Sequence, residues 1–326
     1  MYRKIMGFLE AWKENEHRKP LILQGARQVG KTYSILEFGR IHYENVAYFN
    51  FETNPKLNET FEEKISPDYL IPILSHIAGQ TIVKEKTLIV FDEVQLCERA
   101  LTSLKYFCED APDYHIIVAG SLLGVAVNRA KFSFPVGKVD MKTLYPMDME
   151  EFMIAMGEDE LVEQIKKCFE TNRPMPSALH DAAMQLYRQY LVVGGMPECV
   201  MQFVQTGDYI LIRHTQDIIL TSYLNDMSKY NNLNAIKKTR LAYDNITVQL
   251  SKKKTRFQYK LIKKGGRASE FENAIEWLCL SGIVSQVYRV EQIKKPLENY
   301  RDIDAFKIYV SDLGLLCAKK DLSANN

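Results

Sequence analysis

Eight residues near the N-terminus have the types and spacing that cradle phosphate groups. They match the pattern GxxxxGK[ST] and are Gly25, Ala26, Arg27, Gln28, Val29, Gly30, Lys31 and Thr32. In this pattern the glycines let backbone N–H groups point at phosphate oxygens, and the following helix adds its positive N-terminal dipole. We expect Lys31 to reach the β- and γ-phosphates and the Thr32 hydroxyl to ligate Mg²⁺. Tyr33 follows directly and is included in the predicted binding set.

Two carboxylates complete the predicted chemistry. The apolar run 88–91 ends in Asp92 and Glu93. Asp92 could hold Mg²⁺ through its water shell, and Glu93 could polarise the attacking water. The alternative is that both side chains merely cap the next helix. The chain has no NKxD guanine-reading motif, so we expect ATP rather than GTP as the ligand. Glu93 beside Asp92 favours hydrolysis over a small-molecule kinase reaction.

Short apolar runs alternate with amphipathic stretches in the first half of the chain. Such alternation predicts βαβ units and a parallel sheet whose strands are buried on both faces. The expected strands are residues 21–23, 46–51, 88–91, 116–119 and 139–144, and the expected helices are residues 31–43 and 98–110.

Beyond Met147 the strand pattern fades and helical periodicity takes over. Proline- and glycine-containing breaks at residues 172–176 and 194–197 separate the helices. The expected helices are residues 148–156, 160–171, 178–193 and 208–227.

Composition limits the classes of protein that this chain can be. It has 326 residues, of which 46% are hydrophobic and 25% charged, a globular composition long enough for two or more domains. The net charge of +1 predicts no partner by itself. The six cysteines form no CxxC pair, which argues against a common zinc site and fits a reduced, cytoplasmic protein. No apolar run is long enough to span a membrane.

Residues 229–267 form a basic region. They contain twelve lysines and arginines and a single acid, Asp244, with Tyr230, Tyr243, Phe257 and Tyr259 interleaved. The next stretch places Phe271, Ala274, Ile275 and Leu278 on one helical face, and residues 283–290 are typical of a strand. The order of helix, basic turn, helix and strand pair predicts a winged-helix-like domain.

This basic region has two interpretations. It could contact the phosphate backbone of DNA or RNA, in a manner sensitive to salt. It could instead be a solvated face, or one that docks a protein or another part of the chain, as most charge runs are. We favour the second, and we expect the aromatic residues to be core rather than base-stacking residues.

Longer stretches resemble a large prokaryotic group of AAA-superfamily ATPases that carry a C-terminal domain of unknown function. The resemblance covers nearly the whole chain in order. Its matching stretches are residues 18–32, 91–95, 119–121, 144–152, 190–198 and 307–316.

The resemblance implies an α/β fold: a P-loop NTPase sheet of the AAA type with helices on both faces, then a helical region and a winged-helix-like domain. The expected boundaries are residues 1–155, 156–228 and 229–326. It also implies that Ser121 ends a strand between those of Gly25 and Asp92 and senses the γ-phosphate. A serine after a strand is as often a turn or cap residue.

Two departures from the family pattern affect the predicted activity. Many relatives have Gly-Arg where this chain has Gly137 and Lys138. If that arginine acts on a neighbouring subunit, lysine cannot reproduce its bidentate contact, and Arg129 is a nearby substitute. Relatives also continue past the stretch 307–316 into a nuclease-like segment, so we expect the last domain to be truncated.

The residues therefore support two classes of function. The first is a Mg²⁺-dependent ATPase that couples hydrolysis to a shape change of an interaction domain, either alone or as a homo-oligomer. The alternative is a nucleotide-gated binding or regulatory module with little turnover. A weaker third hypothesis is an ATPase stimulated by nucleic acid bound at residues 229–267.

Overall fold

A computed structural model describes residues 1–121, 135, 137–229, 232–252 and 256–320. The chain divides into two compact units. The N-terminal unit is Arg3–Tyr145, and the C-terminal unit is Pro146–Asn326 together with Met1–Tyr2.

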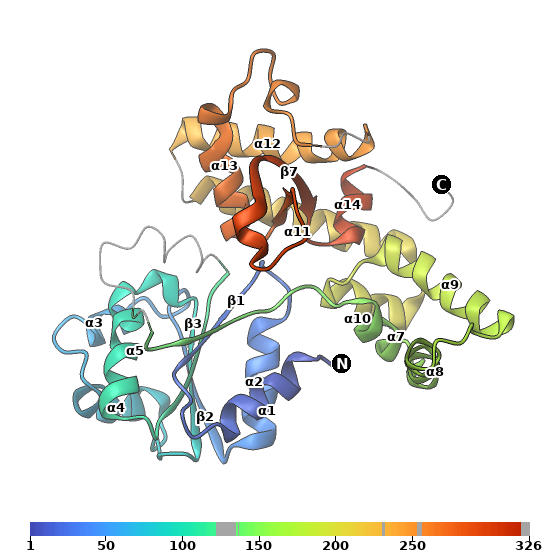
Figure 1. The fold of residues 1–326 in the computed structure, drawn as a ribbon. Coiled ribbons are helices and arrows are strands. Elements are labelled where there is room, and N and C mark those ends of the chain that lie inside the picture. The colour runs from blue at the N-terminus through green and yellow to red at the C-terminus, as the bar shows by residue number, and fades with distance from the viewer. Residues whose placement is uncertain (122–134, 136, 230–231, 253–255, 321–326) are drawn as a thin grey trace. The chain divides into compact units, whose positions relative to one another are not determined.

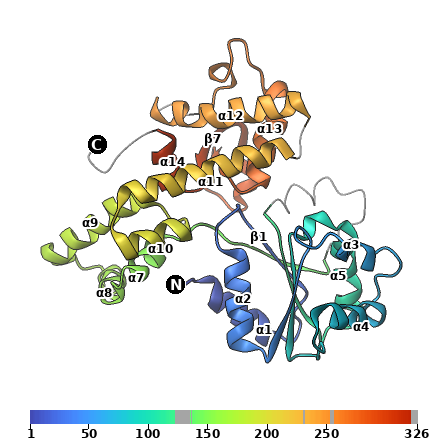
Figure 2. The same ribbon diagram turned by 180° about the vertical axis from the view of Figure 1, so that it is seen from behind.

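The N-terminal unit contains a parallel five-stranded sheet in the order β2-β3-β4-β1-β5. Figures 1 and 2 show α1 and α2 on one face of this sheet and α3, α4 and α5 on the other. All five predicted strands are confirmed, with ends within one residue of those expected. The elements are α1 (Ile5–Glu14), β1 (Leu21–Gln24), α2 (Lys31–His42), β2 (Asn45–Asn50), α3 (Leu57–Thr60), α4 (Pro67–Ala78), β3 (Thr87–Asp92), η1 (Val94–Leu96), α5 (Glu98–Asp110), β4 (His115–Ala119) and β5 (Asp140–Thr143).

The central strands of this sheet are covered on both faces. Every residue of β3 and β4 is buried, which explains why these runs are nearly continuous in apolar residues. Beside them, the rings of Phe49, Phe51, Phe61 and Phe91 pack at centroid distances of 5.7–5.9 Å. The packing holds the carboxyl ends of the strands as a firm edge on which a site can be built.

Three helices of this unit were not predicted, of which α3 is a single four-residue turn. Helix α1 buries Ile5, Leu9 and Trp12, which recur at helical spacing within a stretch notable for its charge. Helix α4 begins at Pro67, where a missing N–H costs nothing, and ends at Gly79 in the left-handed region. In α1 and α4, the charged or proline-containing sequence obscured the apolar face.

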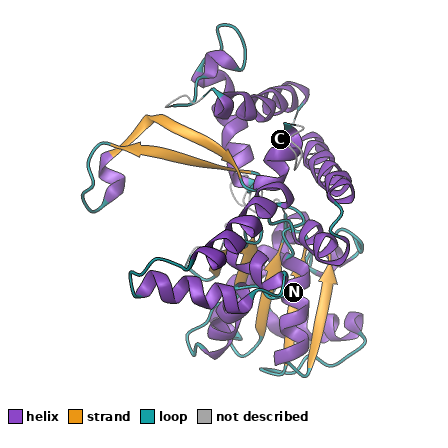
Figure 3. Cartoon of the chain, turned by 90° about the vertical axis from the view of Figure 1, so that its right-hand side faces the viewer, coloured by secondary structure: helices purple, strands orange, loops and turns teal. Residues whose placement is uncertain are grey.

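The C-terminal unit is mainly helical and has one antiparallel hairpin, β6–β7, which Figure 3 shows as a long two-stranded ribbon. The four helices expected after Met147 are confirmed, whereas α10 was missed because Pro197 looked like a break but occupies the first turn. The elements are α7 (Met149–Ala155), α8 (Asp159–Glu170), α9 (Ser177–Val193), α10 (Pro197–Thr206), α11 (Tyr209–Lys229), α12 (Leu233–Ser251), η2 (Tyr259–Leu261), α13 (Ala268–Leu280), β6 (Val284–Val290), η3 (Leu297–Tyr300), β7 (Arg301–Val310) and α14 (Leu313–Lys319).

A buried carboxylate joins distant segments of this unit. Asp312 accepts hydrogen bonds from the Gly195 N–H at 2.6 Å and from the Leu315 N–H at 2.8 Å, which caps α14. The Met147 N–H in turn donates to the Gly195 carbonyl at 2.7 Å. A Cβ on Gly195 would lie 1.9 Å from the Met147 carbonyl oxygen, so only glycine fits there. Three of the stretches that resemble the ATPase family thus meet in one core.

From α12 to β7 the elements follow the predicted order of helix, turn, helix and strand pair. The winged-helix assignment and the three-part division of the chain stay predictions.

Candidate nucleotide-binding site

The phosphate loop connects β1 to α2 and depends on glycine at both ends. Gly25 has φ of 147°, and a Cβ there would lie 2.2 Å from the Leu144 carbonyl oxygen. Gly30 has φ of 90° and precedes the first residue of α2. Between them Ala26 and Val29 are buried, Arg27 is half-buried and Gln28 is exposed, as is Tyr33 in the first turn of the helix. The loop is therefore anchored by its apolar residues and turned by its glycines.

The first backbone N–H groups of α2 have no acceptor within the helix. Among the described residues no side chain caps this helix, and its first turn contains no acidic residue. The first amide of the helix interior, that of Ser34, donates to the Gly30 carbonyl at 3.0 Å. The preceding N–H groups and the helix dipole can thus bind an anion such as a phosphate.

Lys31 lies within the loop. Its side chain is 7% exposed, and its Nζ donates to the carbonyl oxygens of Gly25 at 2.9 Å and Ala26 at 2.8 Å. These contacts hold a buried positive charge beside the first amides of α2. The ammonium therefore lies inside the loop, and its role in binding phosphate stays a prediction.

Asp92 connects the loop to the end of β3. Its Oδ2 accepts hydrogen bonds from the Thr32 hydroxyl at 2.9 Å and from the Tyr48 hydroxyl at 2.8 Å. Its Oδ1 accepts from the Glu93 N–H at 3.0 Å. Oxygen ligands of this kind suit Mg²⁺. Within the described part of the chain no cluster of three His, Cys, Asp or Glu side chains could hold a metal ion.

Tyr48 was not among the predicted site residues. It lies on β2, which pairs with β3 so that Asn50 stands opposite Asp92. Burial, together with the hydrogen bond to Asp92, raises the pKa of the Tyr48 hydroxyl to about 12, so it remains a donor. Sequence offered no signal for it, because an aromatic residue in a strand is usually core.

Glu93 has a special backbone conformation. Its φ is 51°, in the left-handed region, which turns the chain sharply at the end of β3. Its carboxylate accepts a hydrogen bond from the Gln95 side chain. Burial, reinforced by the neighbouring charge of Asp92, raises the pKa of Glu93 above its usual value. A carboxylate of raised pKa is a stronger general base.

The remaining predicted residues lie at different edges of the sheet. Ser121 is buried just after β4, the strand between β3 and β1, and so stands at the same edge as Asp92 and Gly25. Lys138 precedes β5, which starts opposite Leu21, and therefore lies at the edge away from the phosphate loop. There its Nζ pairs with Glu109 at 2.9 Å. Arg129 lies outside the described residues.

Arg3 is a second residue that sequence reasoning missed. It is 4% exposed, and its guanidinium donates to the Val29 carbonyl at 2.9 Å and to the Tyr145 carbonyl at 2.8 Å. Val29 belongs to the phosphate loop, and Tyr145 is the last residue of the N-terminal unit. The contacts span the whole unit in sequence, so no local pattern could have revealed them.

The basic region divides into two parts. Within its turn Lys260, Lys263, Lys264 and Arg267 are exposed. The helix α13 that follows carries Glu270, Glu272 and Glu276 and no lysine or arginine. Phe257 is buried and packs on Phe306, and Tyr243 is buried as well, as predicted for core residues. The positive charge therefore lies on α12, which carries Lys237, Lys238 and Arg240, and in the turn, and it does not extend along α13.

Comparison with known proteins gives two family matches. Residues 17–153 match a family described as an AAA domain, and residues 184–326 match a family described as a domain of unknown function. Among curated protein sequences none matches the chain. Within the described residues no helix has both the length and the apolar character needed to cross a membrane.

Among solved structures the chain is similar to the Walker-type ATPase PABY2304 of Pyrococcus abyssi, with a TM-score of 0.59 and 14% identity over 98% of this chain and 95% of that one. It also matches the Aeropyrum pernix ORC2 protein at TM-score 0.46, with 10% identity over 98% and 94% of the two chains. Thermotoga maritima RuvB matches at TM-score 0.39, with 14% identity over 94% and 90%. The strand order and the family match together show that the N-terminal unit has the fold of an AAA-type P-loop domain.

Proposed function

We propose that this chain is a Mg²⁺-dependent ATPase that couples ATP hydrolysis to a conformational change of its C-terminal unit. The proposal rests on the hydrogen bond between Thr32 and Asp92, which joins the phosphate loop to the end of β3. Glu93 follows Asp92 directly and has a raised pKa. Phosphoryl transfer to water needs a loop that binds the phosphates, oxygen ligands for Mg²⁺ and a general base. The three lie at one edge of the sheet in this proposal.

Each residue has a separate role in this proposal. Lys31 and the first amides of α2 would bind the phosphates. Thr32 and Asp92 would hold Mg²⁺, which when bound neutralises charge on the β- and γ-phosphates. Glu93 would orient the attacking water and accept its proton, while Gln95 holds the carboxylate. Ser121 would contact the γ-phosphate from the end of β4.

Two substitutions test this assignment. Lys31→Ala should abolish ATP binding, because it removes the buried charge beside the helix N-terminus. Glu93→Gln should keep ATP binding and reduce turnover by roughly 10²–10³-fold, since only the base is lost. Glu85→Gln is a matched control: this exposed glutamate also has positive φ, at 61°, but precedes β3 at the other edge of the sheet. Calorimetric titration measures ATP binding, and the rate of phosphate release measures turnover. Unchanged turnover in Lys31→Ala and Glu93→Gln would reject the proposal.

A second candidate is a nucleotide-gated binding module with little turnover. The ion pair between Lys138 and Glu109 favours it, because the residue expected to act on a neighbouring subunit is a lysine already paired within its own chain. Turnover per subunit measured over a range of protein concentrations separates the two. A rate that rises with concentration supports an active oligomer, and a low, constant rate with tight ATP binding supports the module.

Contact with nucleic acid stays a weaker proposal. The exposed basic turn supports it, but the three glutamates of α13 would repel phosphates beside that turn. Binding of a DNA or RNA duplex at two salt concentrations tests it. A complex that weakens steeply with salt would support the contact, and no binding at low salt would remove it.

A further inference from the structure

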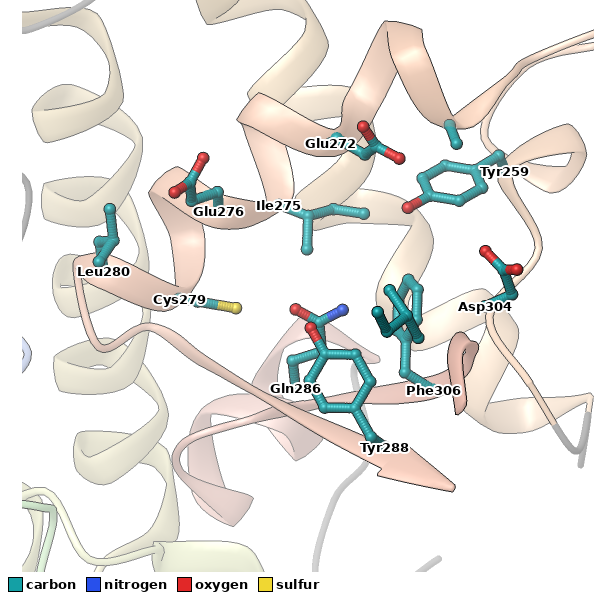
Figure 4. Close-up of a pocket in the computed structure, with 12 residues that line it drawn as sticks. Tyr259, Glu272, Ile275, Glu276, Cys279, Leu280, Gln286, Tyr288, Asp304 and Phe306 are labelled. Atoms are coloured by element: carbon teal, nitrogen blue, oxygen red, sulfur yellow. The ribbon is translucent and has the colours of Figure 1, made fainter. Parts of the chain in front are cut away.

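A cavity of about 360 Å³ lies in the C-terminal unit between α13 and the β6–β7 hairpin. Figure 4 shows side chains converging on it from η2, α13 and both strands of the hairpin. None of its lining residues belongs to the nucleotide site. The volume is sufficient for a small organic molecule.

Three aromatic rings form walls of this cavity. The ring of Phe306 lies 6.2 Å from that of Tyr259 and 5.8 Å from that of Tyr288, measured between centroids. The ring planes are inclined to Phe306 by 72° and 57°. Figure 4 places Tyr259 and Tyr288 on different sides of the cavity. Ring faces set at steep angles to one another form a cage rather than a stack.

Three carboxylates add negative charge to this cage. Glu272 and Glu276 come from α13 and Asp304 from β7, and the lining contains no lysine, arginine or histidine. Among the described residues none of these three side chains forms an ion pair, whereas their neighbour Glu270 pairs with Lys263 at 3.6 Å. Burial raises the pKa of Tyr259 to about 12, and the nearby Glu272 adds to this effect, so its hydroxyl remains neutral. The cavity thus has three acidic side chains and no basic one in its lining.

We propose that this cavity binds an organic ammonium ion. Its alkyl groups would pack on the three rings, the ring faces would attract its charge, and the carboxylates would complete the neutralisation. The chain already uses such contacts, because the Arg301 guanidinium lies 4.5 Å from the centroid of Tyr288 and Lys319 Nζ lies 3.6 Å from that of Tyr243. Arg301 is not a lining residue of the cavity.

Other ligand classes fit this lining less well. An anion would be repelled by the three carboxylates. A metal ion would lack a converging set of ligands, because among the described residues no three His, Cys, Asp or Glu side chains are placed to hold one. A neutral apolar molecule would bury the rings but leave the carboxylates unused. The inference does not rest on the proposed ATPase activity, since no residue is shared.

Calorimetric titration of the full chain with choline tests the proposal at low ionic strength. The matched control ligand is 3,3-dimethylbutan-1-ol, which has the same shape with a carbon in place of the charged nitrogen. We expect choline to bind with a Kd on the order of 1 mM or tighter, and the neutral isostere to bind at least about tenfold more weakly. Equal affinities, or no heat of binding for choline at about 50 mM, would overturn the proposal.

Variants then assign the binding to this cavity. Tyr288→Leu should weaken choline binding by about tenfold, and Glu272→Gln by about two- to fivefold. Glu270→Gln lies on the same helix outside the cavity and should bind as the parent does. Glu272 is exposed, so its replacement leaves the fold intact even if Tyr288→Leu proves unstable. Identical affinities for the Glu272 and Glu270 variants would contradict the inference.

Discussion

The two units each contain a buried charged residue that holds distant backbone, and they use it differently. Arg3 in the N-terminal unit donates to the carbonyls of Val29 and Tyr145. Asp312 in the C-terminal unit accepts from the N–H groups of Gly195 and Leu315. Both side chains are 4% exposed. The arginine holds the predicted phosphate-binding loop, whereas the aspartate holds a core junction.

The charges themselves also differ in kind. A guanidinium remains charged at any physiological pH. Asp312 can titrate, and burial raises its pKa to about 6 against the effect of its backbone hydrogen bonds. The N-terminal unit therefore supports its candidate site with a permanent charge, while the C-terminal unit stabilises its core with a charge that depends on pH. Because Trp12 lies in one unit and Trp277 in the other, their fluorescence reports on the two separately.

The largest effect is expected from Asp312→Ala. It leaves two buried N–H groups without their acceptor and should reduce the free energy of unfolding of the C-terminal unit by about 3–4 kcal/mol. Urea unfolding followed at Trp277 measures it, while ATP binding should persist. Asp312→Asn keeps one carbonyl acceptor, so its free energy of unfolding should lie between those of Asp312→Ala and the parent. The control is Asp181→Ala, at an exposed site on α9. An equal loss of unfolding free energy in this variant would show that the hydrogen bonds of Asp312 do not stabilise the unit.

The next effect concerns Arg3→Ala. Losing two charge-assisted hydrogen bonds should destabilise the N-terminal unit by about 2–3 kcal/mol and loosen the phosphate loop, so ATP affinity should fall by about tenfold or more. Arg3→Lys should restore part of the affinity through a single hydrogen bond. Calorimetric ATP titration measures the change. The control is Arg40→Ala, at an exposed site on α2, which should bind ATP with the affinity of the parent. Parent-like ATP affinity in Arg3→Ala would mean that the arginine supports only the fold.

A smaller effect is expected from Tyr48→Phe. Removing one donor to Asp92 should raise the Mg²⁺ concentration needed for half-maximal ATP binding by about two- to tenfold. ATP affinity without Mg²⁺ should not change. The matched control is Tyr43→Phe, whose hydroxyl contacts His115 Nδ1 at 2.7 Å rather than Asp92. If both variants need the same Mg²⁺ concentration as the parent, Tyr48 does not position Asp92.

A further effect is expected in the pH dependence of stability. The raised pKa of Asp312 means that its contribution to the C-terminal unit grows as pH falls from about 6 towards 4 and is lost as pH rises through 6. Burial lowers the pKa of His115 to about 4, so its contribution to the N-terminal unit is present above about pH 6.5 and is lost as pH falls towards 4. Between pH 7 and pH 5 each should change its unit by about 1–2 kcal/mol, in opposite directions.

Unfolding of Asp312→Asn and His115→Phe at both pH values tests this. Each substitution should flatten the pH dependence of the free energy of unfolding of its own unit, as reported by the tryptophan of that unit. The other unit should keep its pH dependence. Parent-like slopes in both variants would show that other groups control the pH response.

Sequence alone determined the sheet and the core of the candidate site. The runs around Leu21, Leu88 and Ile116 are continuous in apolar residues because their strands are buried on both faces, so their ends could be placed within one residue. The set from Gly25 to Thr32 is contiguous, and Asp92 and Glu93 end a strand, so local pattern sufficed for them. The roles of these residues stay predictions.

Only the tertiary structure decided which other side chains reach that site. Arg3 and Tyr48 contact Val29 and Asp92 across 26 and 44 positions, and such contacts leave no periodic signal in a single chain. It also placed Lys138 at the far edge of the sheet, because the direction of β5 depends on its pairing with β1. The aromatic and acidic cavity has the same origin. Its rings and carboxylates come from separate elements that only the packing of α13 on the hairpin brings together.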